Sequence, residues 1–290
     1  MSALPRLSAA VSTSGLTGTS IDVDGTRVHY VDAGDGAPLV FVHGGPAWSF
    51  TWRDVIARLA DRFRCIAIDL PGFGRSPALA GDVSLRQYAN LVRRFVERLD
   101  LDRVTLVAND TGGPIGFRAA SLAPERYARF VAVDTFAFAL DEFPMVRLFL
   151  RLFSSPPARF VNRRLNLLPR AVTSFGTPRR RWTEAERAAY LEPFASAAMR
   201  DRCIGLLRAL VREPGYLDEL DRGVRVLTDR PLLTIFGSED PVRRYGFPEK
   251  FAAMFPRSTH RIVTGAKHFA HEDDPDGVAT FIRDWLSDQR

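Results

Sequence analysis

Cysteine and lysine are scarce in this sequence, and the shortage of cysteine excludes two classes of protein. Only two cysteines, Cys65 and Cys203, occur in 290 residues, so the chain cannot form a disulfide framework. Neither cysteine has the spacing of a metal ligand, and the five histidines do not cluster with them, so we expect neither a metal site nor a cofactor. This use of cysteine favours a reducing, cytoplasmic setting.

Lysine is confined to Lys250 and Lys267, so the formal net charge of +6 rests on arginine. Because the arginines are spread along the chain, we expect no nucleic acid among the partners of the protein. Long apolar runs are absent as well: no stretch of eighteen apolar residues occurs, and we expect no membrane partner. Residues 1–20 lack the continuous apolar segment of a signal peptide, so we expect no export by that route.

The rest of the composition is that of a folded protein with a substantial core. Apolar residues make up 46% of the chain and charged residues 26%, which excludes a disordered protein. A chain of this length forms one large domain or two small ones. At this size about three quarters of the surface of the unfolded chain can be buried, which leaves room for a sheltered pocket.

Short apolar runs alternate with helical periodicity between residues 18 and 137. The strand-like runs are residues 27–31, 38–42, 65–70, 104–108 and 130–133. Between them, residues 52–59 and 85–99 carry apolar side chains at the spacing of amphipathic helices. This alternation predicts an α/β fold with helices on both faces of a largely parallel sheet. The dipeptide Asp24-Gly25 predicts that the first two runs form an antiparallel hairpin at one edge.

The alternation breaks between residues 138 and 225, where prolines separate short helical segments and no buried strand occurs. The helical segments there are residues 145–153, 184–191 and 200–211. Further on, strands follow at 232–236 and 261–263, and a helix at 275–286. We therefore divide the chain into an α/β core of residues 18–137 and 226–290, a helical cap of residues 138–225, and an N-terminal tail of residues 1–17.

The most informative stretch is residues 104–113, which run from a strand into a helix around Asp110. Small residues lie two positions before and two positions after Asp110, which is the pattern of a nucleophile elbow. Serine is the usual residue at such an elbow, whereas an aspartate attacks saturated carbon or opens an epoxide and forms an ester with the substrate. The alternative is that Asp110 only caps the helix that follows it.

Two further residues complete a possible catalytic set. Asp240 follows the strand at 232–236, and His268 follows the strand at 261–263. The order nucleophile, acid, histidine is that of α/β-hydrolases. In this set His268 takes a proton from water, and Asp240 fixes the tautomer of His268. Asp134, after the strand at 130–133, is the alternative acid, and we prefer Asp240 for its Gly-x-x-Asp-Pro setting.

The segment His43-Gly44-Gly45-Pro46 directly follows the strand at 38–42. An oxyanion hole needs two backbone N–H groups, one from this loop and one from the residue after the nucleophile. We therefore expect the N–H groups of Gly45 and Thr111 to form it. His43 is interpreted as a brace of the loop and not as a catalytic group.

The chain resembles α/β-hydrolases over nearly its whole length, and within them the haloalkane dehalogenases and epoxide hydrolases. The matching pieces, in chain order, are residues 43–46, 48–50 with 52–53, 69–76, 109–116, 237–241 and 268–269. The resemblance implies the α/β-hydrolase fold: a mostly parallel eight-stranded sheet flanked by helices, with a helical cap inserted between strands six and seven.

Two departures from this resemblance concern the group that leaves the substrate. Haloalkane dehalogenases hold the halide with a tryptophan after the nucleophile and often an asparagine in the oxyanion loop, positions that Thr111 and Gly45 occupy here. Trp182 in the cap is a candidate replacement donor. Epoxide hydrolases protonate the opening oxygen with cap tyrosines, for which Tyr190 and Tyr216 are candidates.

Together these patterns predict a haloalkane dehalogenase-like hydrolase that acts on a small, neutral organic substrate. The reaction passes through a covalent ester between the substrate and Asp110. We expect the pocket to be lined by aromatic side chains, namely Phe136, Phe138, Trp182 and Tyr190. Epoxide hydrolysis is the first alternative. An esterase-like hydrolase and a non-catalytic, ligand-binding α/β-hydrolase scaffold are the others.

Overall fold

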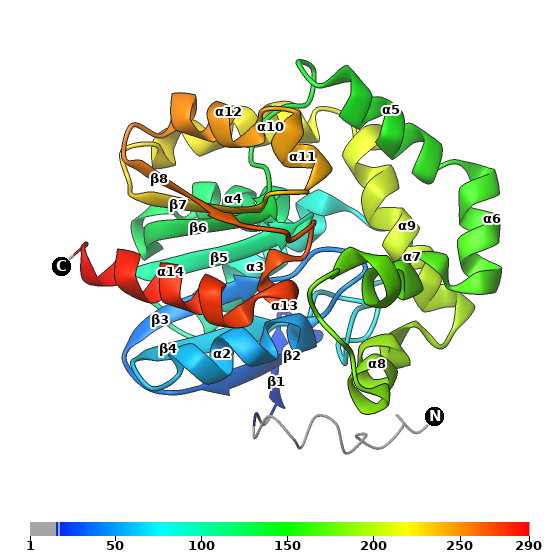
Figure 1. Ribbon diagram of the computed structural model, residues 1–290, viewed down its shortest axis with the longest axis horizontal. Helices are drawn as coiled ribbons and strands as arrows, with labels where there is room; N and C mark the ends of the chain where they lie inside the picture. Colours follow the sequence, from blue (N-terminus) through cyan, green and yellow to red (C-terminus); the bar gives the residue numbers. More distant parts are fainter. Residues whose placement is uncertain (1–15, 17, 290) are drawn as a thin grey trace.

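The computed structural model describes residue 16 and residues 18–289, and an eight-stranded sheet forms its centre (Figure 1). The tail expected at residues 1–17 therefore lies outside the described residues, apart from Leu16. The strands lie in the order β1-β2-β4-β3-β5-β6-β7-β8. Their bounds are Gly18–Val23 (β1), Thr26–Ala33 (β2), Ala37–Val42 (β3), Phe63–Ile68 (β4), Val104–Asp110 (β5), Tyr127–Thr135 (β6), Leu232–Gly237 (β7) and Ser258–Val263 (β8).

The sheet is parallel from β4 to its β8 edge, whereas β2 pairs antiparallel with both β1 and β4. The mostly parallel, eight-stranded α/β fold expected from the sequence is confirmed. The predicted pairing of the first two apolar runs is wrong. The turn at Asp24-Gly25 joins β2 to β1, and β3 lies on the far side of β4. β1 has no clear apolar pattern in the sequence because its side chains, at the edge of the sheet, are mostly exposed.

Helices cover both faces of the sheet because alternate side chains of each buried strand point to opposite faces. In β3, Val40 packs with the helices α3 and α4, whereas Phe41 packs with α2 and α14 on the other face. The core helices are α2 (Arg53–Leu59), α3 (Leu85–Arg98), α4 (Gly112–Leu122), α11 (Pro241–Arg244), α12 (Phe247–Met254), α13 (Ala270–Asp273) and α14 (Pro275–Ser287).

Only helices and loops connect β6 to β7, and most of these helices lie to one side of the sheet in Figure 1. They are α5 (Pro144–Phe153), α6 (Pro156–Leu165), α7 (Leu167–Ala171), α8 (Glu184–Leu191), α9 (Ala197–Arg212) and α10 (Tyr216–Val224). α5 and α6 pack against α9, whereas α10 packs against the core helix α4. None of the helices that the structure describes is long and apolar enough to cross a bilayer.

Short helical turns and capping side chains fix the starts of several helices. The hydroxyls of Ser84, Thr183 and Ser196 accept hydrogen bonds from backbone N–H groups in the first turns of α3, α8 and α9. At α8 the side chain of Glu186 completes a capping box with Thr183. The 3₁₀ turns are Ser49–Trp52 (η1), Pro124–Arg126 (η2), Glu192–Phe194 (η4) and Arg225–Leu227 (η5), and Val172–Gly176 (η3) is a π-helical turn.

Candidate active site

Asp110 lies at a sharp turn between β5 and α4, with its backbone in the left-handed region at φ +50°. Small neighbours are required there, because a Cβ added at Gly112 would lie 2.4 Å from the carbonyl oxygen of Val42. A Cβ added at Gly44 would lie 2.3 Å from Oδ1 of Asp110. The hydroxyl of Thr135 donates to the backbone carbonyl of Asp110 and holds the turn from the side of β6. This geometry is that of a nucleophile elbow.

The structure brings Asp110, Asp240 and His268 together in one hydrogen-bonded chain. Nε2 of His268 lies 3.0 Å from Oδ2 of Asp110, and Nδ1 lies 3.0 Å from Oδ2 of Asp240. Asp240 follows β7 and is fully buried, whereas the side chains of Asp110 and His268 are 15% and 28% exposed. In such an arrangement the solvent-reachable carboxylate can attack a substrate. The histidine, with the buried acid behind it, can then activate water.

The loop after β3 places a backbone donor on the same carboxylate. The N–H of Gly45 donates to Oδ1 of Asp110 at 3.0 Å, and the backbone N–H of Thr111 also helps to lower the pKa of that carboxylate. His43 is buried behind the loop: its Nε2 accepts the N–H of Leu70 at 3.0 Å, and its Nδ1 lies 2.7 Å from the carbonyl oxygen of residue 44. Burial lowers the pKa of His43, so its ring is neutral and braces the loop.

The charges of the site stabilise a protonated His268. Burial lowers the pKa of His268, but the charge of Asp240 and the hydrogen bonds and charge of Asp110 outweigh it, so this pKa lies well above its usual 6.5. Burial raises the pKa of Asp110, and the hydrogen bond and charge of His268 together with the N–H groups around it bring the pKa below its usual value. The two carboxyl groups that flank His268 therefore favour its protonated form.

Asp134, the alternative acid, is buried beside this chain but turns its oxygens elsewhere. Its Oδ1 accepts the N–H of Gly237 at 2.8 Å, and its Oδ2 accepts the N–H of Ala270 at 2.9 Å. Burial and the neighbouring charge of Asp240 raise the pKa of Asp134 well above its usual value. Because Nδ1 of His268 points at Asp240, the geometry favours Asp240 as the acid.

Phe136 lies beside the elbow, since its carbonyl oxygen is 2.6 Å from the position of a Cβ added at Gly113. Its ring is 7% exposed and packs against Phe138 and Phe247, with ring centroids 5.9 and 5.7 Å away. Phe138 itself is fully buried in this aromatic cluster. Of the two phenylalanines expected at the pocket, Phe136 is therefore the one whose backbone lies next to Gly113 of the elbow.

The polar atoms of the expected cap residues already have partners. Nε1 of Trp182 donates to the hydroxyl of Thr177 at 2.8 Å, and the hydroxyl of Tyr190 donates to the carbonyl oxygen of Pro46 at 2.9 Å. Tyr190 thus reaches the loop that carries Gly45, whereas the N–H of Trp182 is used within the cap. The hydroxyl of Tyr216 donates to the carbonyl oxygen at position 114 in α4, at 3.0 Å.

A buried charge cluster near Trp182 was not expected from the sequence. Nη1 of Arg53 lies 2.8 Å from Oε1 of Glu272, and Nη1 of Arg180 lies 3.0 Å from Oδ2 of Asp54. Arg53 and Arg180 both approach Glu186 of α8, so the cluster ties α2 and α13 of the core to the helical region. The sequence held no signal for it, because the same residues on a helix are usually solvated.

Asp69, for which the sequence predicted no role, organises the loop after β4. Its carboxylate accepts the N–H groups of Ser49 at 2.7 Å and Arg75 at 2.9 Å, and it lies 2.8 Å from Nδ1 of His29. These bonds fix the segments on either side of the oxyanion loop. A buried aspartate after a strand, followed by Pro-Gly, was the available signal.

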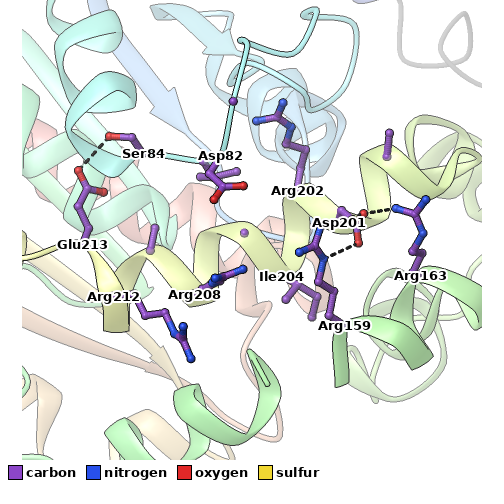
Figure 2. A pocket seen from close by; sticks show the side chains of 15 residues that line it. Asp82, Ser84, Arg159, Arg163, Asp201, Arg202, Ile204, Arg208, Arg212 and Glu213 are labelled. Atoms are coloured by element: carbon purple, nitrogen blue, oxygen red, sulfur yellow. Dashed lines mark hydrogen bonds and ion pairs between the residues drawn. The ribbon is translucent and has the colours of Figure 1, made fainter. Parts of the chain in front are cut away.

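A hollow of about 510 Å³ lies elsewhere, between α6, α9 and residues 81–84 (Figure 2). It contains neither Asp110 nor His268, so the chemistry of the elbow lies outside it. Asp201 sits on one wall, where it pairs with two of the five arginines that line it: Arg159, Arg163, Arg202, Arg208 and Arg212. Within residues 16 and 18–289, no group of three or more His, Cys, Asp or Glu residues is arranged to hold a metal ion.

Known proteins resemble this chain in sequence and in structure. Residues 37–275 match the family described as alpha/beta hydrolase fold. Haloalkane dehalogenase 2 of Mycobacterium tuberculosis is 34% identical over 88% of this chain and 90% of its own length. The cis-3-alkyl-4-alkyloxetan-2-one decarboxylase of Shewanella oneidensis is 29% identical over 91% and 86%. The crystal structure of a haloalkane dehalogenase from Bradyrhizobium elkani superposes with a TM-score of 0.82, at 23% identity over 94% of this chain and 98% of that one.

Proposed function

The chain belongs to the α/β-hydrolase family, within its haloalkane dehalogenase group, and from this premise we propose that it forms an ester between Asp110 and its substrate and hydrolyses it. The family makes the protein a hydrolase. The observation that carries the proposal is the position of His268, 3.0 Å from Asp110 on one side and 3.0 Å from Asp240 on the other.

The first step is a displacement at saturated carbon. Oδ1 of Asp110 already faces the N–H of Gly45, where the oxyanion of the second step forms, so Oδ2 is the oxygen that attacks. A bond forms between Oδ2 and the carbon of the substrate, and the leaving group departs with the electron pair. Esterification neutralises Asp110, so one of the two charges that raise the pKa of His268 disappears. His268 then releases its proton to solvent and becomes a base.

The second step hydrolyses the ester. Water adds to Cγ of Asp110 as His268 takes a proton from it, and Oδ1 becomes an oxyanion that accepts the N–H groups of Gly45 and Thr111. The bond between Cγ and Oδ2 then breaks, and the product alcohol takes the proton of His268. The carboxylic acid left on residue 110 passes its proton to His268, which restores the resting ion pair.

The leaving group decides between two candidate substrates. An expelled halide needs N–H donors, but Nε1 of Trp182 donates to Thr177, and the N–H of Gly45 is used by Asp110. A strained four-membered lactone needs no separate halide site, because its leaving carboxylate stays attached to the substrate. The relative from Shewanella oneidensis is named for such a ring, an oxetan-2-one. Displacement of halide remains our first candidate by family, and ring opening of a lactone is the second.

Epoxide opening ranks below both candidates because the opening oxygen needs an acidic hydroxyl. The hydroxyl groups of Tyr190 and Tyr216 donate to backbone carbonyl oxygens in the described structure. Burial raises the pKa of each tyrosine, which makes each a weaker acid. We further propose that residues 138–225 act as the cap over the site, with Phe136, Trp182 and Tyr190 shaping the pocket.

Trapping the ester tests this proposal. A His268→Gln variant should carry out the displacement but not the hydrolysis, because no base activates water. It is incubated with a brominated alkane, a strained four-membered lactone, an epoxide and a carboxylic ester, and its intact mass is measured. We expect the mass of an alkyl group to be added from the bromide, or the mass of the whole lactone from the ring. The added mass identifies the substrate class.

The matched control is the double variant Asp110→Asn and His268→Gln, in which no adduct should form. An adduct of equal mass in this control would place the nucleophile elsewhere and overturn the role of Asp110. If no panel member modifies His268→Gln, and Asp110→Asn binds the same compounds as the wild type, the non-catalytic scaffold is favoured instead.

A further inference from the structure

The outward side of α5 carries a continuous stripe of large apolar side chains. The helix buries Val146 and Leu150 against the rest of the protein. On its other side five side chains are between 42% and 59% exposed, at positions that recur three and four residues apart: Met145, Leu148, Phe149, Leu152 and Phe153. The rings of Phe149 and Phe153 stack on one another with centroids 4.2 Å apart. An apolar stripe of this length is unusual on a protein surface that contacts only water.

The stripe continues onto α6, which follows it at the outer rim of the molecule. Phe160 and Leu165 of α6 are 59% and 55% exposed. α5 and α6 both pack on the outer side of α9, so their free sides face away from the sheet (Figure 1). We call the exposed apolar side chains of α5 and α6, together with Arg151 of α5 and Arg164 of α6, the cap face.

The segment that carries the stripe has charge of one sign, with Asp141 and Glu142 directly before it. Residues 143–183 contain nine arginines and no aspartate or glutamate. Five of these arginines pair with carboxylates from other segments, including the two that reach Asp201 in Figure 2. The other four are exposed and have no carboxylate within ion-pair distance among the described residues: Arg151, Arg164, Arg170 and Arg181.

We propose that the cap face rests on the surface of an anionic lipid bilayer. Leucine and phenylalanine side chains enter the boundary between head groups and acyl chains, and flanking arginines bind the lipid phosphates. A second copy of the chain fits this surface less well, because a symmetric contact would set unpaired arginines against each other. The inference is independent of the proposed function. It differs from the expectation of no membrane partner, because the proposed contact lies on the bilayer surface and requires no helix to cross the bilayer.

Binding to vesicles of known composition tests the proposal with the whole 290-residue chain. Flotation is compared between vesicles of phosphatidylcholine alone and of an equal mixture of phosphatidylcholine and phosphatidylglycerol. We expect binding to the mixed vesicles only. Replacing three stripe residues together, Leu148→Ser, Phe149→Ser and Leu152→Ser, should weaken that binding at least about 100-fold. The pair Arg151→Gln and Arg164→Gln should weaken it about 25-fold.

A matched control removes three exposed apolar side chains outside the cap face: Val226→Ser, Tyr245→Ser and Ile262→Ser. This control should float like the wild type, and far-ultraviolet circular dichroism checks that all variants fold. Absence of wild-type binding to the mixed vesicles overturns the proposal, as does equal binding to neutral vesicles. An equal loss of vesicle binding in the control variant also overturns the proposal. Self-association of the wild type that the stripe variant abolishes, without vesicle binding, would assign the cap face to a second copy of the chain.

Discussion

Replacing Asp240 by asparagine separates the two steps of the proposed reaction. Asp240 does not touch the substrate: it acts through Nδ1 of His268, at 3.0 Å. The variant keeps the shape of the residue but removes the negative charge that stabilises the imidazolium. Attack by Asp110 needs no base, so we expect displacement to proceed at close to the wild-type rate. Hydrolysis of the ester needs His268 as a base, so this step should slow.

The size of the effect follows from a general value for catalytic triads and from a second buried aspartate, Asp134, beside Asp240. In a triad of this kind, an aspartate-to-asparagine change at the acid lowers kcat about 10,000-fold. Here Asp134 is buried next to Asp240, whose charge raises the pKa of Asp134. Without that charge Asp134 ionises more readily and restores part of the negative potential at His268. We therefore expect Asp240→Asn to lose about 100- to 1,000-fold, and the double variant with Asp134→Asn to lose about 10,000-fold.

Rapid-quench kinetics with mass detection of the ester on Asp110 measures both steps in one experiment. The single variant Asp134→Asn should lose less than about tenfold in ester hydrolysis. Its effect should fall mainly on stability, because asparagine has only one oxygen to replace the two that accept the N–H groups of Gly237 and Ala270. The reasoning is refuted if Asp134→Asn slows hydrolysis as much as Asp240→Asn does. It is also refuted if Asp240→Asn slows displacement and hydrolysis equally.

Three further expectations concern stability, each measured by urea unfolding. Arg53→Met should lower the free energy of unfolding by about 3 kcal/mol, because it removes the nearest cation from the buried carboxylate of Glu272. Adding Glu272→Gln should recover most of that loss, and additive losses in the double variant would contradict this reasoning. The folded state binds the proton of His268 more tightly than the unfolded state, so the stabilisation from this group is complete below pH 6.5 and is lost as pH rises through the raised pKa. Relative to His268→Gln, the wild type should therefore lose stability over that window, and parallel pH curves would exclude the ion pair. Gly112→Ala should cost about 3 kcal/mol, since the new Cβ meets the carbonyl oxygen of Val42 at 2.4 Å, and a neutral effect would show that the elbow can shift.

The central part of the fold could be predicted because its signals are local. Buried parallel strands are short apolar runs, and the amphipathic helices between them repeat at the helical period, so the α/β pattern followed directly. The elbow around Asp110 was visible because a tight turn requires small neighbours in sequence. Glu184–Leu191 begins at a capping box that the sequence spells out, and the helix was expected with those bounds.

Other features could not be predicted because they depend on contacts between distant segments. β1 has little apolar pattern at the edge of the sheet, so its pairing with β2 was missed. The cluster around Arg53 and Glu272 joins residues more than 200 positions apart. The choice between Asp134 and Asp240 rested on motif frequency, whereas the direction of Nδ1 of His268 is a property of the folded chain. The sequence likewise could not show that the polar atoms of Trp182 and Tyr190 are taken up by Thr177 and Pro46.

The hydrogen bond from Tyr190 to Pro46 joins helix α8 to the loop that holds the carboxylate of Asp110. Pro46 is the residue after Gly45, whose N–H holds Oδ1 of Asp110, and Leu206 of α9 lies over Gly45 as well. A hinge motion that lifts α8 and α9 to admit substrate would break this bond and release the loop that carries the donor. Admission of substrate and loss of the N–H donor at Asp110 would then be one movement, and the oxyanion hole would have to form again in each turnover.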